Sequence, residues 1–279
     1  MLTISNPSDV TGVVFIDIDG TLVPAPGSAV HVARYLGTEA AMAEAEADYA
    51  AGRLTNPQVA AVDAKSWSGR TEREIDDWLA GVPLVDGIQE TVVWCRGQGL
   101  IPVLATLAWQ SIGKHLCHRF GFDAYCGPEL ETAEGRFTGR VLAELDEYGK
   151  RDFAVRYAGS LGLSSRDCAA IGDSRSDLPL FKKAGLSIAF NADQQARETA
   201  DVSVEGEDIR VVIPLLEEWL KVRGTSPSPK SPAGHALGAR PMSLSRVGSW
   251  CVSGAARGPA PPRPAWPGWR SDRLPRGGR

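Results

Sequence analysis

Short apolar runs rich in β-branched residues alternate along residues 10–223 with segments whose apolar positions have helical spacing. Several runs end at a polar or acidic residue, as expected of strands that are buried on both faces. The pattern predicts strands at 13–16, 101–105, 169–171, 187–190 and 201–204, and helices at 87–96, 151–161 and 209–220. This alternation predicts an α/β fold, with a Rossmann-like parallel sheet flanked by helices.

One segment interrupts the alternation, because residues 27–82 carry only helical signals, notably at 39–51 and 71–80. Thr71 followed by Glu74 forms a capping box, which marks the start of a helix. We therefore predict a small helical cap, residues 24–82, inserted after the first strand. The core would comprise residues 1–23 and 83–223.

Charge and composition change abruptly after Val222. Residues 224–279 hold nine Lys or Arg and one acid, Asp272, whereas residues 1–223 carry a net charge of −12. The basic segment is dense in Pro, Gly, Ser and Arg, so we predict that it is disordered. It is either an arm for anionic partners or an out-of-frame translation of a GC-rich gene, and we favour the second. The acidic core argues against nucleic-acid binding.

Cysteine spacing and the start of the chain bear on location. Five cysteines are scattered without paired spacing, which indicates a reducing compartment. Cys117 lies between His115 and His118, but on a helix it would point away from the face that the histidines share. Residues 1–10 lack signal-peptide features, and no stretch is apolar enough to span a bilayer. We expect a cytoplasmic protein without membrane contact; no pattern specifies its oligomeric state.

Polar side chains follow three of the predicted strands. Asp17 and Asp19 end the first, Thr106 ends the second, and Asp173 with Asp177 follows the third. In an open parallel sheet these carboxyl ends lie together at one edge. Each acid alone is typical of a turn or helix cap. Together they predict a site of crowded carboxylates that needs a hard cation, and Mg²⁺ suits such oxygen ligands.

The order of these residues resembles the haloacid dehalogenase superfamily, and within it the phosphoserine phosphatase-like branch. The superfamily motifs appear as Asp17-x-Asp19-Gly20-Thr21, then Thr106, then Lys150 ahead of a predicted helix, then Gly172-Asp173-Ser174-x-x-Asp177. The branch is indicated by residues 135–139, 181–192 and 200–201. The resemblance covers residues 12–222.

The resemblance implies a Mg²⁺-dependent phosphatase that acts through an aspartyl-phosphate. Asp17 would be the nucleophile and Asp19 the general acid and base. The cation would bind Asp17, Asp173 and the backbone carbonyl of Asp19. Gly20 and Thr21 would support this motif. Asp19 distinguishes phosphatases from the superfamily's dehalogenases, which do not need it.

The remaining motifs imply the phosphate site. Thr106 would donate its hydroxyl and Leu107 its backbone N–H to phosphate oxygens. Lys150 would bind phosphate and offset the acids, with Asp177 holding Lys150 or a metal-bound water.

The substrate is expected to be a small phosphorylated metabolite. The stretch after Leu22 has no acid and residues 54–64 have no arginine, although phosphoserine phosphatases use both to read serine. Another small phosphate, such as a sugar or specialised-metabolite phosphate, is therefore favoured, and Trp109 would be either a wall for it or a packing residue. The alternatives are a phosphotransferase acting on an alcohol, or a non-catalytic binding protein on this fold.

Overall fold

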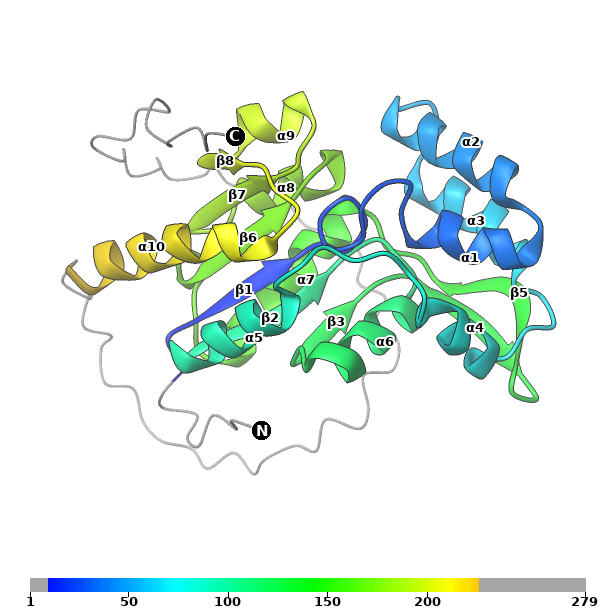
Figure 1. Cartoon of the computed structure of the whole chain (residues 1–279), viewed down its shortest axis with the longest axis horizontal. Coiled ribbons are helices and arrows are strands. Elements are labelled where there is room, and N and C mark those ends of the chain that lie inside the picture. The colour runs from blue at the N-terminus through cyan, green and yellow to red at the C-terminus, as the bar shows by residue number, and fades with distance from the viewer. Residues whose placement is uncertain (1–9, 226–279) are drawn as a thin grey trace, which may run out of the picture. The chain divides into compact units, whose positions relative to one another are not determined.

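The computed structural model describes residues 10–225, so the predicted tail lies outside the described residues from position 226 on. Six parallel strands form a sheet of order β3-β2-β1-β6-β7-β8 (Figure 1). The strands are β1 (Gly12–Ile16), β2 (Leu100–Ala105), β3 (Ala124–Cys126), β6 (Cys168–Gly172), β7 (Leu186–Phe190) and β8 (Val202–Val204). The five predicted strands and their parallel arrangement are confirmed. The short strand β3 was not predicted.

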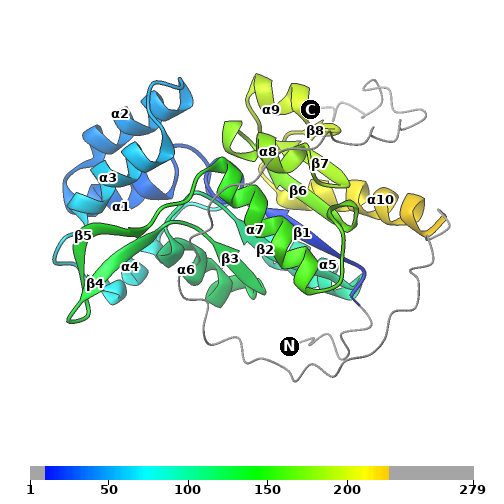
Figure 2. The same cartoon turned by 180° about the vertical axis from the view of Figure 1, so that it is seen from behind.

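Helices cover both faces of this sheet. In Figure 1, α5 (Ile88–Gly97) and α10 (Ile213–Thr225) lie on the near face, and Figure 2 shows α7 (Glu147–Ser160) and α8 (Leu178–Phe181) on the other. The other flanking helices are α6 (Gln110–Phe120) and α9 (Gln194–Thr199), with single 3₁₀ turns η2 (Ser165–Asp167), η3 (Arg175–Asp177) and η4 (Ile209–Val212). Within residues 10–225, no helix is long and apolar enough to cross a membrane.

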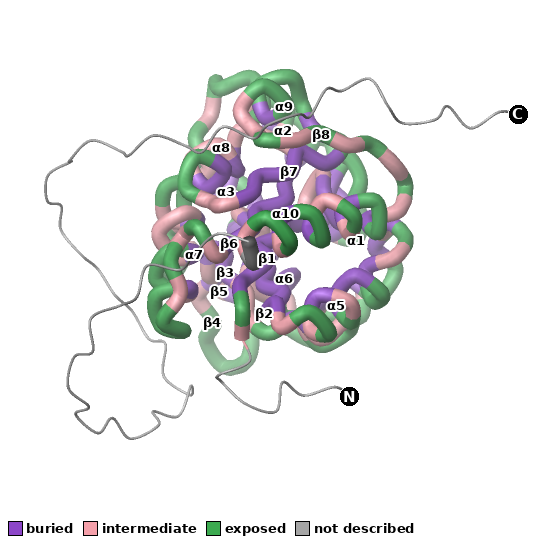
Figure 3. The backbone as a smooth tube through the Cα atoms, turned by 90° about the vertical axis from the view of Figure 1, so that its left-hand side faces the viewer, coloured by how far each residue is buried: buried purple, intermediate pink, exposed green. Residues whose placement is uncertain are grey.

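The centre of the sheet is the buried core. β1, β2, β6 and β7 are buried at every position, as the purple tube in Figure 3 shows for the middle of the molecule. Side chains from alternate positions of β1, such as Val13 and Phe15, pack against Ala154 and Ala158 of α7 and Phe181 of α8. A strand buried on both faces explains why these segments are continuous apolar runs.

The helical insertion after β1 consists of α1 (Ser28–Leu36), α2 (Glu39–Ala50), α3 (Asn56–Ser66) and α4 (Glu72–Leu79). The first three share a small apolar core that includes Val30, Met42 and Val59. The capping box at the start of α4 is confirmed, since the Thr71 hydroxyl accepts from the Glu74 N–H at 3.2 Å and the Glu74 carboxylate accepts from the Thr71 N–H at 2.8 Å.

An antiparallel hairpin that the sequence analysis missed lies against the insertion. It is formed by β4 (Glu129–Ala133) and β5 (Arg136–Ala143). The Phe137 N–H donates to the Arg70 carbonyl at 2.8 Å, and the Gly69 N–H donates to the Phe137 carbonyl at 2.8 Å. The Phe137 ring also packs edge-on against Trp67. The helical insertion is therefore tied to a segment of the chain that follows the second core strand.

Helix α7 begins earlier than predicted, so Lys150 lies inside the helix and not ahead of it. The Asp146 carboxylate accepts from the Gly149 N–H at 2.7 Å and caps the helix, which starts at Glu147. An aspartate at this position satisfies an N–H that has no partner within the helix. Lys150 consequently has a fixed position in the first helical turn.

Two residues of the stretch from His115 to His118 contact different neighbours. His115 on α6 forms a 2.7 Å contact with the Asp76 carboxylate, while the Cys117 thiol is directed toward the Ala124 carbonyl. Cys117 thus faces away from His115, as the helical spacing predicted.

Candidate active site

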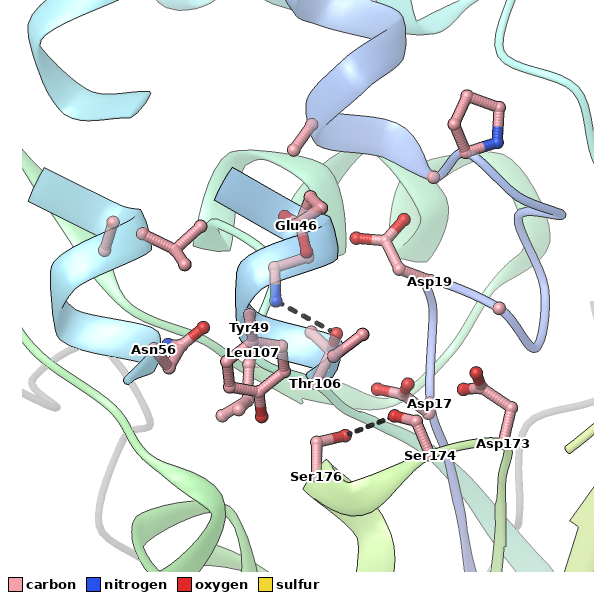
Figure 4. Close-up of a pocket in the computed structure, with 18 of the residues that line it drawn as sticks. Asp17, Asp19, Glu46, Tyr49, Asn56, Thr106, Leu107, Asp173, Ser174 and Ser176 are labelled. Carbon is pink, nitrogen blue, oxygen red and sulfur yellow. Dashed lines mark hydrogen bonds between the residues drawn. The ribbon is translucent and has the colours of Figure 1, made fainter. Parts of the chain in front are cut away.

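A cavity of about 310 Å³ lies at the carboxyl ends of β1, β2 and β6. Asp17, Asp19, Thr106 and Asp173 line one end of it, so the structure brings together the polar residues that follow these strands (Figure 4). The opposite wall comes from α1, α2 and α3 of the helical insertion. Asp17 is only 4% exposed, because β1 runs through the centre of the sheet and ends directly beneath the cavity.

Lys150 is the buried cation of the site. Its Nζ lies 2.8 Å from Asp17 Oδ1 and 2.6 Å from Asp177 Oδ1, and it has no exposed surface. Burial disfavours the charged amine, but the two carboxylates outweigh this and hold the pKa of Lys150 above its ordinary value. Ser176, which the sequence analysis did not single out, lies 3.4 Å from the same amine. Lys150 is thus an ammonium shared between two acids.

Three carboxylates are close enough together to hold one cation. Oxygens of Asp17, Asp173 and Asp177 lie within 4.8 Å of one another. Burial, together with the charge of Asp17, raises the pKa of Asp173 well above its ordinary value, so a cation there would relieve repulsion. Asp17 and Asp173 line the cavity and Asp177 does not, which leaves Asp17 and Asp173 as the better ligands.

The first motif also shapes this acidic site through its small residues. The Thr21 hydroxyl donates to Asp173 Oδ1 at 3.3 Å and orients that carboxylate. Gly20 has a φ of 85°, and a Cβ at this position would overlap the Asp173 carboxylate. A glycine is therefore required both for the turn and for the close approach of β6.

Asp19 is held by the start of α1. Its Oδ1 accepts from the Ser28 N–H at 2.6 Å and its Oδ2 accepts from the Ser28 hydroxyl at 2.9 Å. Burial raises the pKa of Asp19, and the two bonds from Ser28 oppose this only in part. A raised pKa favours a carboxyl that can donate a proton. Ser28 had not been predicted, since a serine at the start of a helix is usually only a cap.

Thr106 and Leu107 lie where β2 ends and both line the cavity. The Thr106 hydroxyl oxygen accepts from the Ala108 N–H at 3.1 Å, which leaves its hydrogen available for an anion. This is the arrangement expected of a loop that binds phosphate oxygens.

Trp109 connects this loop to the helical insertion. Its indole N–H donates to Asp63 on α3 at 2.6 Å, and the Trp67 indole N–H donates to the other oxygen of the same carboxylate at 3.1 Å. Trp109 is 4% exposed and packs at a tilt against Trp67. Of the two roles considered for Trp109, packing is therefore the dominant one, although its edge also lines the cavity.

Asp63→Leu is expected to destabilise the protein, because both indole N–H groups lose their acceptor at about 1–3 kcal/mol each. Burial raises the pKa of Asp63 to about 6, above the unfolded value of about 3.9. The native state therefore binds this proton more tightly, and the stability that Asp63 contributes falls as pH rises through about 6. Denaturant unfolding should show that Asp63→Leu lowers the free energy of unfolding more at pH 5 than at pH 8, by on the order of 1 kcal/mol.

The exposed Asp77 on α4 supplies the matched control. Asp77→Leu should change the unfolding free energy little at either pH. An equal penalty for Asp63→Leu at both pH values would contradict the burial argument.

Glu46, Asn56 and Arg175 are among the further polar residues that line the cavity and were not predicted. Burial and the charges of Asp19 and Asp63 raise the pKa of Glu46 to about 7. Glu46 lies in an alanine-rich stretch with several other acids, so the sequence gives no signal that separates it from solvated neighbours. Asn56 begins α3 and Arg175 belongs to η3; both positions are also typical of ordinary surface polar residues.

Known proteins resemble this chain in sequence and in fold. Residues 14–182 match the family model described as haloacid dehalogenase-like hydrolase. The chain is 24% identical to the phosphoserine phosphatase of Methanocaldococcus jannaschii over 205 residues, 73% of this chain and 97% of that protein. It is 29% identical to the phosphoserine phosphatase of Streptomyces coelicolor over 204 residues, 73% of this chain but 50% of that protein, so it spans half that relative's length.

A solved substrate-bound phosphoserine phosphatase complex superimposes with a TM-score of 0.67 at 24% identity, covering 74% of this chain and 98% of that one. This likeness shows that the two share a fold. The match to the family model covers more than half of the chain, and the matched range contains Asp17, Lys150 and Asp173. The chain belongs to the haloacid dehalogenase-like hydrolases, and within them it is phosphoserine phosphatase-like.

Proposed function

We propose that the protein is a Mg²⁺-dependent phosphatase that hydrolyses a small phosphate monoester through an aspartyl-phosphate on Asp17. One observation carries this proposal. Asp17 lies at the base of the cavity with the Lys150 ammonium 2.8 Å from one oxygen and Asp173 beside it. The buried carboxylate is thereby partly neutralised and faces open space, as a nucleophile toward an anionic phosphate requires.

The carboxylate oxygens that lie close together at this site fit Mg²⁺, because this ion prefers hard oxygen ligands. Asp17, Asp173 and the backbone carbonyl of Asp19 would hold it. Once bound, the ion would offset negative charge on the phosphate and on the acids.

In the first step, a carboxylate oxygen of Asp17 attacks phosphorus, and the bond between phosphorus and the alcohol oxygen breaks. The Asp19 carboxyl gives its proton to that oxygen, so the alcohol leaves neutral. In the second step, Asp19 takes a proton from water, whose oxygen attacks phosphorus and frees Asp17 and inorganic phosphate. Ser28 holds Asp19 in place for both transfers.

Thr106, Leu107 and Lys150 would form the phosphate site. The Thr106 hydroxyl and the Leu107 N–H would donate to phosphate oxygens, and Lys150 would contribute a fixed positive charge. Asp177 would hold Lys150 in position through its 2.6 Å contact with the amine. Gly20 and Thr21 support the site by fixing the position of Asp173.

The helical insertion would act as a cap over this site. We propose boundaries at residues 24 and 82, with residues 1–23 and 83–223 forming the core, except that the β4–β5 hairpin within 83–223 moves with the cap. The contacts of Phe137 with Gly69 and Arg70 support this grouping. We further propose a cytoplasmic location, which the four free cysteines of the described residues support.

A phosphate-release screen tests the proposed function. The protein would be incubated with Mg²⁺ and a panel of small phosphate monoesters, with Asp17→Asn as the blank and a chelator as the second blank. Release that requires both Asp17 and Mg²⁺ is expected. Absence of release from every monoester would end the proposal.

Asp19→Asn is expected to lower kcat by about 10²–10⁴-fold, because the amide cannot donate or take up a proton. The loss should be smallest for p-nitrophenyl phosphate, whose leaving group needs no proton. Single-turnover rates of alcohol release from p-nitrophenyl phosphate and from an alkyl phosphate check this, because they report the first step alone; equal losses in that step would show that Asp19 does not protonate the leaving group.

A further inference from the structure

The wall of the cavity opposite Asp17 is acidic. The described residues that line it from the helical insertion include two acids, Glu46 and Asp63, and no lysine or arginine. Apart from Arg175, the cation of the site is Lys150, which lies against Asp17 at the phosphate end. The leaving group of a bound monoester would face negative charge.

Arg175 is the one basic residue among those that line the cavity, and its guanidinium is already committed. It lies 3.5 Å from the Glu147 carboxylate, donates to the Tyr49 carbonyl at 2.9 Å and stacks on the Tyr49 ring at 4.5 Å. These contacts leave little capacity for a substrate carboxylate.

Glu46 differs from Asp63 in what it contacts. Asp63 accepts hydrogen bonds from two indoles and from Ser66. The Glu46 carboxylate, by contrast, has no hydrogen bond or ion pair with any side chain or backbone group in the 10–225 range, and it lies beside Asp19 in Figure 4. Its half-buried carboxylate experiences repulsion from Asp19 and Asp63 without any compensating donor. A positively charged ligand would supply that donor.

Two more acceptors line the same cavity. The Asn56 side-chain nitrogen donates to the Leu145 carbonyl at 2.8 Å, which leaves its oxygen to accept. The Tyr49 hydroxyl is buried and has no partner among the described residues. An alkylammonium carries three N–H donors, one of which the Glu46 carboxylate would accept, and the other lining oxygens keep this part of the cavity polar.

We propose that Glu46 determines specificity by binding the ammonium of an amino-alcohol phosphate while Asp17 takes the phosphoryl group. This rests on the proposed function and narrows its substrate class to monoesters whose alcohol carries an amine and no carboxylate. An anionic alcohol would meet Glu46 without a free arginine to offset it.

The test compares three substrates of similar size: 2-aminoethyl phosphate, neutral propyl phosphate and anionic phosphoglycolate. The wild-type kcat/KM should be about 10- to 100-fold higher for the amine than for propyl phosphate, the range of a charged hydrogen bond, and lowest for phosphoglycolate. Glu46→Gln should reduce the ratio of amine to propyl substrate to about 1. Glu44→Gln, an exposed glutamate on the same helix, should leave the ratio unchanged.

The outcomes separate the inference from the proposed function. Hydrolysis of p-nitrophenyl phosphate with no preference for the amine, or a preference that survives Glu46→Gln, overturns the role of Glu46 and leaves the phosphatase intact. Without any turnover, calorimetry with 2-aminoethylphosphonate and propylphosphonate still tests recognition. Tighter binding of the amine that requires Glu46 supports the inference, and equal binding overturns it.

Discussion

Asp17→Asn is expected to lower phosphate release by about 10⁴-fold or more, because an amide is a very poor nucleophile toward phosphorus. The substitution preserves size, and Lys150 retains Asp177 as its partner at 2.6 Å, so the fold should remain intact. Steady-state phosphate release measures the loss. Circular dichroism and the denaturation midpoint show whether the variant is folded.

A second measurement distinguishes loss of the nucleophile from loss of metal. Wild-type protein quenched in acid during turnover should carry a phosphoryl group on the peptide that contains Asp17, and Asp17→Asn should not. Asp152→Asn, at an exposed aspartate of α7, is the matched control and should retain both turnover and the modified peptide. Full turnover by Asp17→Asn would disprove covalent catalysis at this residue.

The core of this site could be predicted because it depends on strands. Buried parallel strands give continuous apolar runs, and their carboxyl ends lie along one edge of the sheet. Asp17, Thr106 and Asp173 follow three such runs, so their proximity is a consequence of the strand pattern. Their partners across the cavity were not predictable in this way, because a helix exposes polar residues at most positions whether or not they meet a site.

Asp63 illustrates the limit. It is separated by 46 residues from Trp109, and nothing in the local sequence of α3 indicates that two indoles will share its carboxylate.

The β4–β5 hairpin is a different case. Glu134 and Gly135 both have positive φ, at 52° and 75°, as the two central residues of a type I′ hairpin turn require. The acid–glycine pair was therefore a usable turn signal, but the sequence analysis used residues 135–139 only for the family resemblance.

Lys150→Met is expected to abolish turnover and to destabilise the protein by about 3–5 kcal/mol, the range observed when one partner of a buried ion pair is removed. Asp17 and Asp177, which are 4% and 1% exposed, would then lack the ammonium that compensates both charges. Urea unfolding at neutral pH, in the absence of divalent cations, measures the stability term. Lys182→Met, at an exposed lysine, is the matched control and should have little effect.

The double variant Lys150→Met/Asp177→Asn decides whether uncompensated charge is the cause. Because it removes one of the two stranded carboxylates, it should recover part of the lost stability and none of the activity. Burial raises the pKa of Asp177 to about 6 even with Lys150 in place, so this carboxylate is costly to keep ionised without the ammonium. If the double variant were no more stable than Lys150→Met, the loss would instead reflect packing of the lysine side chain. The ammonium would then matter for binding phosphate and not for folding, and the acidic site would have to be stable without it.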